Sequence, residues 1–129
     1  MKVVKVLSKN ILLLLFLLLI FQCGNKKHKN VLNNNIGKII FIELGSINCV
    51  PCKMMEPVMK EIEKKYPKKV KVIFYDVWTK KDRPMATKYN IRLIPTQIFI
   101  DVTGKEFFRH EGFFSKEQIV KLLDKKLNK

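Results

Sequence analysis

A nearly continuous run of apolar and mostly β-branched side chains at residues 36–44 (IGKIIFIEL) constrains the fold of this 129-residue chain more than any other stretch. A strand that faces water on one side alternates between apolar and polar residues, whereas this run is almost uniformly apolar. We therefore expect a strand that is covered on both faces. The run predicts a layered α/β architecture, in which helices pack on both sides of a sheet.

The segments that follow alternate between helical and extended patterns. A helix is predicted over residues 51–66, because apolar side chains recur there at helical spacing. These side chains are Met55, Val58, Met59, Ile62 and Tyr66. Further strands are predicted at 70–77, 96–101 and 105–112, and further helices at 82–90 and from the capping pair Ser115 and Gln118 onward. The order β-α-β-α-β-β-α implies parallel pairing across helices and a closing hairpin.

The N-terminus has the pattern of an exported protein. Residues 1–10 contain three lysines, and residues 11–21 (ILLLLFLLLIF) are apolar and uncharged. This pattern predicts a signal peptide or membrane-targeting segment over residues 1–22. Residues 23–35 are polar without periodicity, which predicts a tether before a domain at 36–129. We expect the folded part to be extracytoplasmic.

Cys23 stands directly after the apolar run. A cysteine in this place resembles the lipid-modified cysteine of bacterial lipoproteins; Ile20 fits that pattern, whereas Gln22 departs from the usual small residue. The resemblance implies lipidation of Cys23 and attachment to the membrane through the lipid. An uncleaved anchor and ordinary cleavage nearby are the alternatives.

The formal net charge of +15 does not by itself indicate binding to nucleic acid. Lysines are spread over every segment, and an exported protein rarely meets nucleic acid, so we expect no such partner. A modest attraction to an anionic membrane surface, or a solvated surface with no partner, accounts for the charge.

Cys49 and Cys52 stand at the predicted start of the first helix, in the stretch GSINCVPCK. A helix N-terminus carries unpaired N–H groups and a partial positive charge, both of which favour a thiolate. We therefore expect the pKa of Cys49 to lie below the ordinary thiol value of about 8.5. Cys49 is then the exposed attacking thiol, and Cys52 is the shielded resolving thiol.

Two other roles for the cysteine pair stay open. Zinc takes four ligands, whereas the pair offers two and only His28 and His110 could add to them, so we expect no metal site. A purely structural disulfide would close a very short loop and would stabilise little. Thiol–disulfide exchange is the favoured role.

Together these features resemble the thioredoxins, specifically membrane-tethered extracytoplasmic thioredoxin-like proteins, over residues 36–127. CVPCK is similar to the family's C-G-P-C-K, with Val50 in place of glycine. Pro57 matches the proline that kinks the active-site helix, and RLIPTQIFI matches the family's Ile-Pro-Thr segment. The resemblance implies a near-minimal thioredoxin-like fold with a central four-stranded mixed sheet, without the N-terminal strand and helix of full thioredoxins.

The resemblance also implies roles for residues away from the cysteines. Pro95 is expected to be cis and to face the cysteine pair, and Gly112 to flank a groove for the substrate. The residues expected to contact substrate are Val50, Pro51, Ile94, Thr96 and Gly112. Asn48 replaces the tryptophan that usually precedes the first cysteine, and Trp78 is expected to be a packing residue.

Glu43 lies six residues before Cys49 on the strand that is predicted to be buried. A carboxyl group there is desolvated, which raises its pKa. The family places an aspartate at this position, where it acts through water as the base for the second cysteine, so the resemblance gives Glu43 that catalytic role. An exposed strand end is the alternative.

The resemblance implies a thiol–disulfide oxidoreductase that reduces extracytoplasmic protein disulfides. Strong oxidants of the family carry a large helical insertion, for which residues 76–95 leave no room. No cofactor is expected beyond the redox-active Cys49–Cys52 disulfide, and a membrane electron transporter of the CcdA/DsbD type would recharge a monomeric protein. A non-catalytic binding module and a metal-transfer chaperone are the alternatives.

Overall fold

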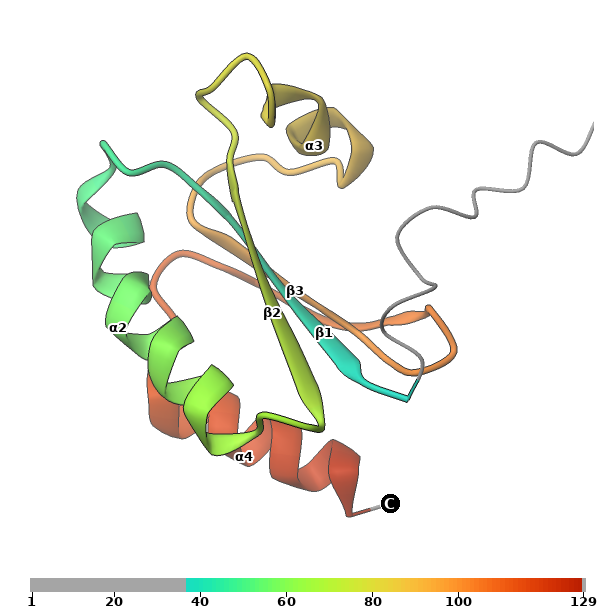
Figure 1. The fold of residues 1–129 in the computed structure, drawn as a ribbon. Helices are drawn as coiled ribbons and strands as arrows, with labels where there is room; N and C mark the ends of the chain where they lie inside the picture. The colour runs from blue at the N-terminus through green and yellow to red at the C-terminus, as the bar shows by residue number, and fades with distance from the viewer. Residues whose placement is uncertain (1–36, 129) are drawn as a thin grey trace, which may run out of the picture. The chain divides into compact units, whose positions relative to one another are not determined.

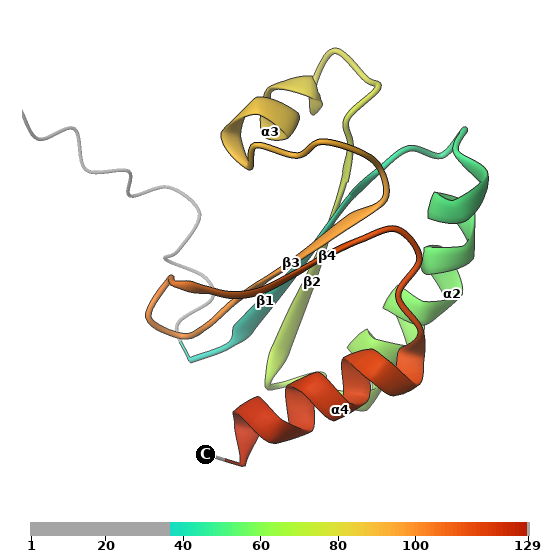
Figure 2. The same cartoon turned by 180° about the vertical axis from the view of Figure 1, so that it is seen from behind.

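The computed structural model describes residues 37–128 and shows one sheet with helices on both faces (Figures 1 and 2). Its elements are β1 (Ile39–Gly45), α2 (Val50–Lys65), β2 (Val70–Asp76), α3 (Arg83–Lys88), β3 (Thr96–Ile100), β4 (Glu106–Glu111) and α4 (Lys116–Leu127). The predicted α/β class and element order are confirmed. The segment 1–22, Cys23 and the tether predicted at 23–35 lie outside the described residues.

The four strands lie in the order β2-β1-β3-β4, as a mixed sheet. β1 pairs with β2 in parallel and with β3 antiparallel, and β4 returns antiparallel beside β3. The expected parallel pairing across helices therefore holds for β1 and β2 but not for β3, which follows α3 and runs in the opposite direction. Gly45 lies opposite Asp76, and Leu44 lies opposite Thr96. The ends of β1 and β2 and the start of β3 therefore meet at one edge of the sheet.

Side chains of the central strand β1 alternate between two cores. One core lies under α2 and α4, where Phe41 stacks on Phe99 of β3 with ring centroids 4.7 Å apart. The other lies under α3 and contains Ile40, Ile42 and Leu44. Both faces of β1 are buried, as its apolar run predicts.

Hydrogen bonds cap helix α4 and join it to the end of α2. In the predicted capping box, the Gln118 N–H donates to Ser115 Oγ and the Ser115 N–H donates to Gln118 Oε1. The Tyr66 hydroxyl at the end of α2 donates to Asp124 of α4 over 2.7 Å. Among residues 37–128, no helix has the length and apolar character needed to cross a membrane.

Candidate active site

A tight turn carries the chain from β1 into α2. The Cys49 N–H donates to the Ser46 carbonyl over 3.1 Å, and the Asn48 N–H donates to Ser46 Oγ over 3.2 Å. Cys49 is the N-cap residue of α2 in an extended conformation, and Pro51 occupies the first turn. Proline suits this position because its missing N–H would have no partner within the helix.

Cys49 and Cys52 form a disulfide across the first turn of α2, with their Cα atoms 5.2 Å apart. Cys49 is 8% exposed and Cys52 is 3% exposed. The expectation of an exposed Cys49 is therefore wrong for this oxidised form. Cys49 is still the more exposed residue of the two.

The environment of the cysteines at the start of α2 favours negative charge. The first turn contains no acidic residue, and Lys53 follows directly after Cys52. Because the first N–H groups of a helix have no partner within it, they present positive partial charge at this end. A reduced Cys49 at the cap would meet that charge.

Gly45 brings β1 into close contact with the second cysteine. A Cβ atom placed on Gly45 would lie 3.2 Å from both Cβ and Sγ of Cys52 and 3.4 Å from the Phe74 ring. The two distances to Cys52 are tighter than ordinary van der Waals contacts. The last residue of the strand therefore needs to be small for Cys52 to occupy its place.

Glu43 is fully buried, two residues before Gly45 on the same face of β1. Burial raises the pKa of its carboxyl group to about 8, and the side chain of Gln97 on β3 acts to lower that pKa. Its neighbour on the other side is the apolar Phe74 of β2. The predicted burial of Glu43 is confirmed, while its catalytic role remains a prediction.

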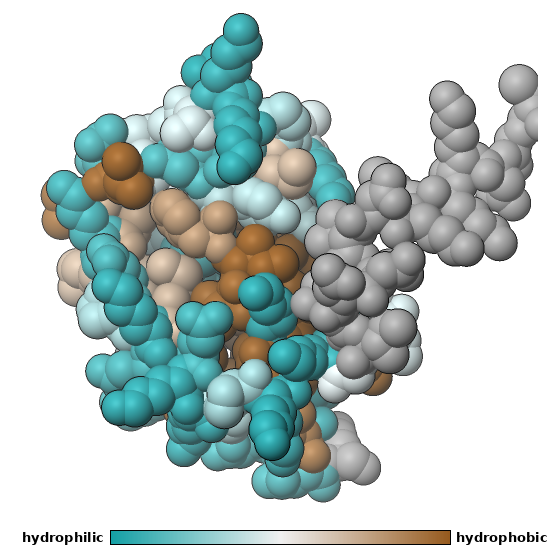
Figure 3. Space-filling view, viewed as in Figure 1, coloured by the Kyte–Doolittle hydropathy of each residue, from teal (hydrophilic) through white to brown (hydrophobic). Residues whose placement is uncertain are grey.

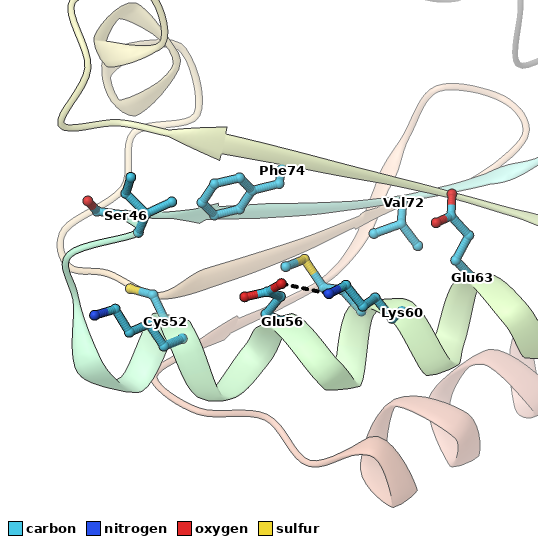
Figure 4. A pocket seen from close by; sticks show the side chains of 10 residues that line it. Ser46, Cys52, Glu56, Lys60, Glu63, Val72 and Phe74 are labelled. Atoms are coloured by element: carbon cyan, nitrogen blue, oxygen red, sulfur yellow. Dashed lines mark hydrogen bonds and ion pairs between the residues drawn. The ribbon is translucent and has the colours of Figure 1, made fainter.

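A groove runs along α2 from the second cysteine, with β2 as its other wall (Figure 4). Its volume is about 570 Å³, and Cys52, Ser46 and Phe74 lie at one end. Glu56 and Lys60 project from α2 into the groove, where they form a 2.7 Å ion pair. In the space-filling view, apolar surface lies exposed between hydrophilic side chains (Figure 3).

The loop before β3 supplies the predicted proline. The Ile94–Pro95 peptide bond is cis, and the Pro95 carbonyl accepts a 2.8 Å hydrogen bond from the Gly112 N–H. Gly112 has φ of +94°, a conformation that favours glycine. Figures 1 and 2 both show the loops before β3 and after β4 beside the N-terminal end of α2.

The residues predicted to contact substrate differ in accessibility. Val50 is 71% exposed, and Pro51 is also exposed. Ile94 is half-buried, whereas Thr96 is fully buried and donates its hydroxyl to the Leu93 carbonyl over 2.7 Å. The Thr96 side chain is thus committed to the loop, which leaves its backbone as the part that could meet substrate.

Two features of the site were missed or misread in the sequence. Asp76 is a buried carboxylate that accepts N–H groups from Ile47 and Trp78, so it joins the loop before Cys49 to the loop after β2. Trp78 is 55% exposed, so its predicted packing role is wrong. It lies two residues beyond Asp76, the last residue of β2, where the chain leaves the sheet and the alternation of the strand ends.

The described residues offer no built metal site. No group of three or more His, Cys, Asp or Glu side chains converges within residues 37–128. The Nε2 atom of His110 lies 3.1 Å from the Phe113 carbonyl, and its ring stacks on Phe114.

Comparison with known proteins places the chain in a recognised group. Residues 25–127 match the family model described as a thioredoxin-like domain, a match that begins inside the predicted tether. The thioredoxin of Staphylococcus aureus is 35% identical over 79 residues, covering 61% of this chain and 73% of that protein. The thioredoxin of Borreliella burgdorferi is 33% identical over 78 residues, covering 57% of this chain and 62% of that protein.

Other relatives overlap less completely. The putative thioredoxin H10 of Arabidopsis thaliana is 33% identical over 67 residues, and the chain spans only 42% of its length. The crystal structure of the germline-specific thioredoxin Deadhead from Drosophila melanogaster superposes with a TM-score of 0.62 at 24% identity. That superposition covers 71% of this chain and 84% of the solved one, and it supports the fold.

Proposed function

Because this chain belongs to the thioredoxin-like domain family, we propose that it is a thiol–disulfide oxidoreductase acting on protein disulfides. The observation that carries the proposal is the Cys49–Cys52 disulfide, which spans the first turn of a helix whose N-terminus has no acidic residue. A disulfide in this place has a leaving sulfur that the helix end stabilises as a thiolate.

The reduced pair transfers two electrons to a substrate in two exchanges. The Cys49 thiolate attacks one sulfur of the substrate disulfide, forms a mixed disulfide and releases the other substrate sulfur as a thiolate. The Cys52 thiol then loses its proton to the Glu43 carboxylate and attacks Cys49 Sγ. The bond between Cys49 and the substrate breaks, the Cys49–Cys52 bond forms, and the second substrate thiolate leaves.

The positions of the two sulfurs support this order. Cys49 is the more exposed residue and caps the helix, whereas Cys52 packs against the end of β1. Glu43 lies on the same face of β1 as Gly45, which contacts Cys52. Proton transfer between Glu43 and Cys52 would pass through a bridging water.

An apolar rim supports binding of unfolded polypeptide around the cysteines. The large apolar side chains exposed on the loops of the described domain and at the start of α2 include Ile47, Val50, Trp78, Leu93 and Phe113. An extended substrate would pair with the backbone of the cis-proline loop, in the manner of strand addition. Replacing Trp78 with Ala is expected to raise KM for a polypeptide substrate more than it lowers kcat.

Reduction outside the cytoplasmic membrane is the direction and place that we propose. The basic N-terminus, the apolar residues 11–21 and Cys23 support export and lipid attachment. Between β2 and β3 the chain forms only the six-residue helix α3, so the large insertion of strong oxidants has no counterpart there. Electrons would come from a membrane transporter of the CcdA/DsbD type.

Insulin reduction by dithiothreitol tests the activity. The full chain in a Cys23→Ala background, which removes the one other thiol, is expected to accelerate precipitation of the insulin B chain. Adding Cys49→Ser is expected to abolish the acceleration. Adding Cys52→Ser instead is expected to leave a covalent complex between Cys49 and substrate. Full activity in the Cys49→Ser chain would support the binding-module alternative and would contradict the proposal.

Direction and place have separate tests. Equilibration with glutathione is expected to give a potential nearer that of thioredoxin, about −270 mV, than the value of about −120 mV of strong oxidants. Metabolic labelling with a fatty acid is expected to mark the wild-type chain and not the Cys23→Ala chain. A soluble, unlabelled wild-type chain would contradict lipid attachment.

A further inference from the structure

Gln97 is an amide side chain buried in the sheet without a hydrogen-bond partner. Its exposed fraction is 0%, and neither Oε1 nor Nε2 has a partner among the described residues. A buried amide in this state opposes folding, because it has given up its hydrogen bonds to water. An apolar side chain would suit the packing better, so the amide calls for another explanation.

The register of the sheet places a second buried polar side chain beside Gln97. Gln97 lies directly opposite Glu43 on β1 and opposite His110 on β4. Side chains opposite each other in antiparallel strands share a face and have Cβ atoms roughly 5 Å apart. Both carboxyl oxygens of Glu43 also lack a partner. Two unpaired polar groups are therefore immediate neighbours in a closed part of the sheet.

Gln97 alone among the direct cross-strand neighbours of Glu43 can form a hydrogen bond with it, because the other neighbour is Phe74. The elements around Glu43 and Gln97 carry other titratable or charged groups. They are His110 of β4 and, at the start of α2, Cys49, Cys52, Lys53 and Glu56. His110 lies beyond Gln97, while Lys53 and Glu56 line the groove on the side of Phe74. None of these groups is a direct cross-strand neighbour of Glu43, so none replaces the Gln97 amide as its hydrogen-bond partner.

The chemistry of an amide matches both states of a carboxyl group. Its NH₂ group donates to a carboxylate, and its carbonyl accepts from the O–H of a carboxylic acid. A lysine in its place would hold Glu43 ionised, and an apolar residue would hold it neutral. A group that takes and returns a proton needs a partner for both forms.

We propose that Gln97 is the positioning residue for Glu43, and that its amide presents NH₂ to the carboxylate and its carbonyl to the acid. This inference rests on the proposed function, in which the Cys52 proton moves to Glu43. On that transfer Cys52 becomes a thiolate and Glu43 becomes neutral. The Gln97 amide then rotates, so that its carbonyl faces the carboxylic acid. Since a hydrogen bond to a charged acceptor is the stronger of the two, Gln97 favours the ionised form overall.

The test is an NMR titration of the Glu43 carboxyl carbon in the oxidised full chain, held in mild detergent. The wild-type midpoint is expected near pH 8. Gln97→Met keeps the length of the side chain without its hydrogen bonds, and is expected to move the midpoint up by about one pH unit, a tenfold rise in proton affinity. The control Ile98→Val changes the next residue, on the opposite face of β3, and should leave the midpoint in place.

An unchanged midpoint in Gln97→Met would overturn the inference. A purely structural Gln97 predicts lower stability with no shift, whereas the positioning role predicts a shift in a chain that is at least as stable. Gln97→Leu is the second variant and carries the same expectation should Gln97→Met not fold. The titration needs no substrate, so a failure of insulin reduction would remove the proposed function without deciding this result.

Discussion

The two faces of β1 differ at the end that leads to the cysteines. Toward α3, the side chains of Ile40, Ile42 and Leu44 are apolar from start to finish. Toward α2, Phe41 is followed by a buried acid, Glu43, and by Gly45. The α3 face stabilises the fold, whereas the α2 face gives up apolar packing just where Cys52 approaches. Departures from the packing pattern therefore mark the candidate site.

The largest difference between the two faces should appear in the pH dependence of stability. The pKa of Glu43 is about 8 in the folded protein and 4.5 in its ordinary range. Because the folded protein retains the proton that the unfolded chain loses, the free energy of unfolding falls as pH rises from about 4.5 to 8. The total loss is roughly 5 kcal/mol, at about 1.4 kcal/mol per pKa unit.

Glu43→Gln should remove this dependence. Urea unfolding of the oxidised chain at several pH values measures it, and the difference between wild type and variant isolates the contribution of Glu43. Parallel curves for the two proteins between pH 5 and 8 would contradict the raised pKa.

A methyl group on the α2 face should disturb both packing and chemistry. Gly45→Ala places a Cβ atom 3.2 Å from Cys52 Sγ, so the sulfur or the strand must shift. We expect a loss of about 1–3 kcal/mol in stability and slower release of substrate from the mixed disulfide. Thermal unfolding and stopped-flow insulin reduction measure the two effects, and a variant with wild-type values for both would show that the contact is unimportant.

On the α3 face, a comparable change should affect stability alone. Ile42→Val removes one buried methylene, which costs about 1 kcal/mol in a packed core. Because Ile42 points away from α2, insulin reduction at 25 °C should stay at the wild-type rate. A rate of insulin reduction that differs from the wild-type rate, while the variant is still fully folded at 25 °C, would mean that the two faces are coupled.

The smallest effect is expected at the surface. Arg92 is 80% exposed in its side chain and pairs with Glu111 through two hydrogen bonds. Exposed ion pairs contribute little to stability, because water screens the two charges, so Arg92→Ala should alter the unfolding midpoint little. A large loss would indicate that this pair supports the neighbouring cis-proline loop.

The α2 face also shows how much of the site could be predicted from the sequence. The burial of Glu43 could be predicted because it sits inside an apolar run, and the helix cap at Cys49 because proline and the apolar stripe locate the helix start. The pairing of Glu43 with Gln97 could not, because it depends on strand order and register. Trp78 was misread because an aromatic side chain usually packs, and its place in a loop at the sheet edge reverses that expectation.

Alkylation of the reduced protein tests whether the end of α2 makes Cys49 a reactive thiolate. The reduced Cys23→Ala chain is mixed with iodoacetamide at pH 6.5, and modification of Cys49 is followed by mass spectrometry. We expect alkylation of Cys49 to be at least tenfold faster than in the same chain unfolded in urea, because more thiolate is present. Equal rates for the folded and unfolded chains would contradict it.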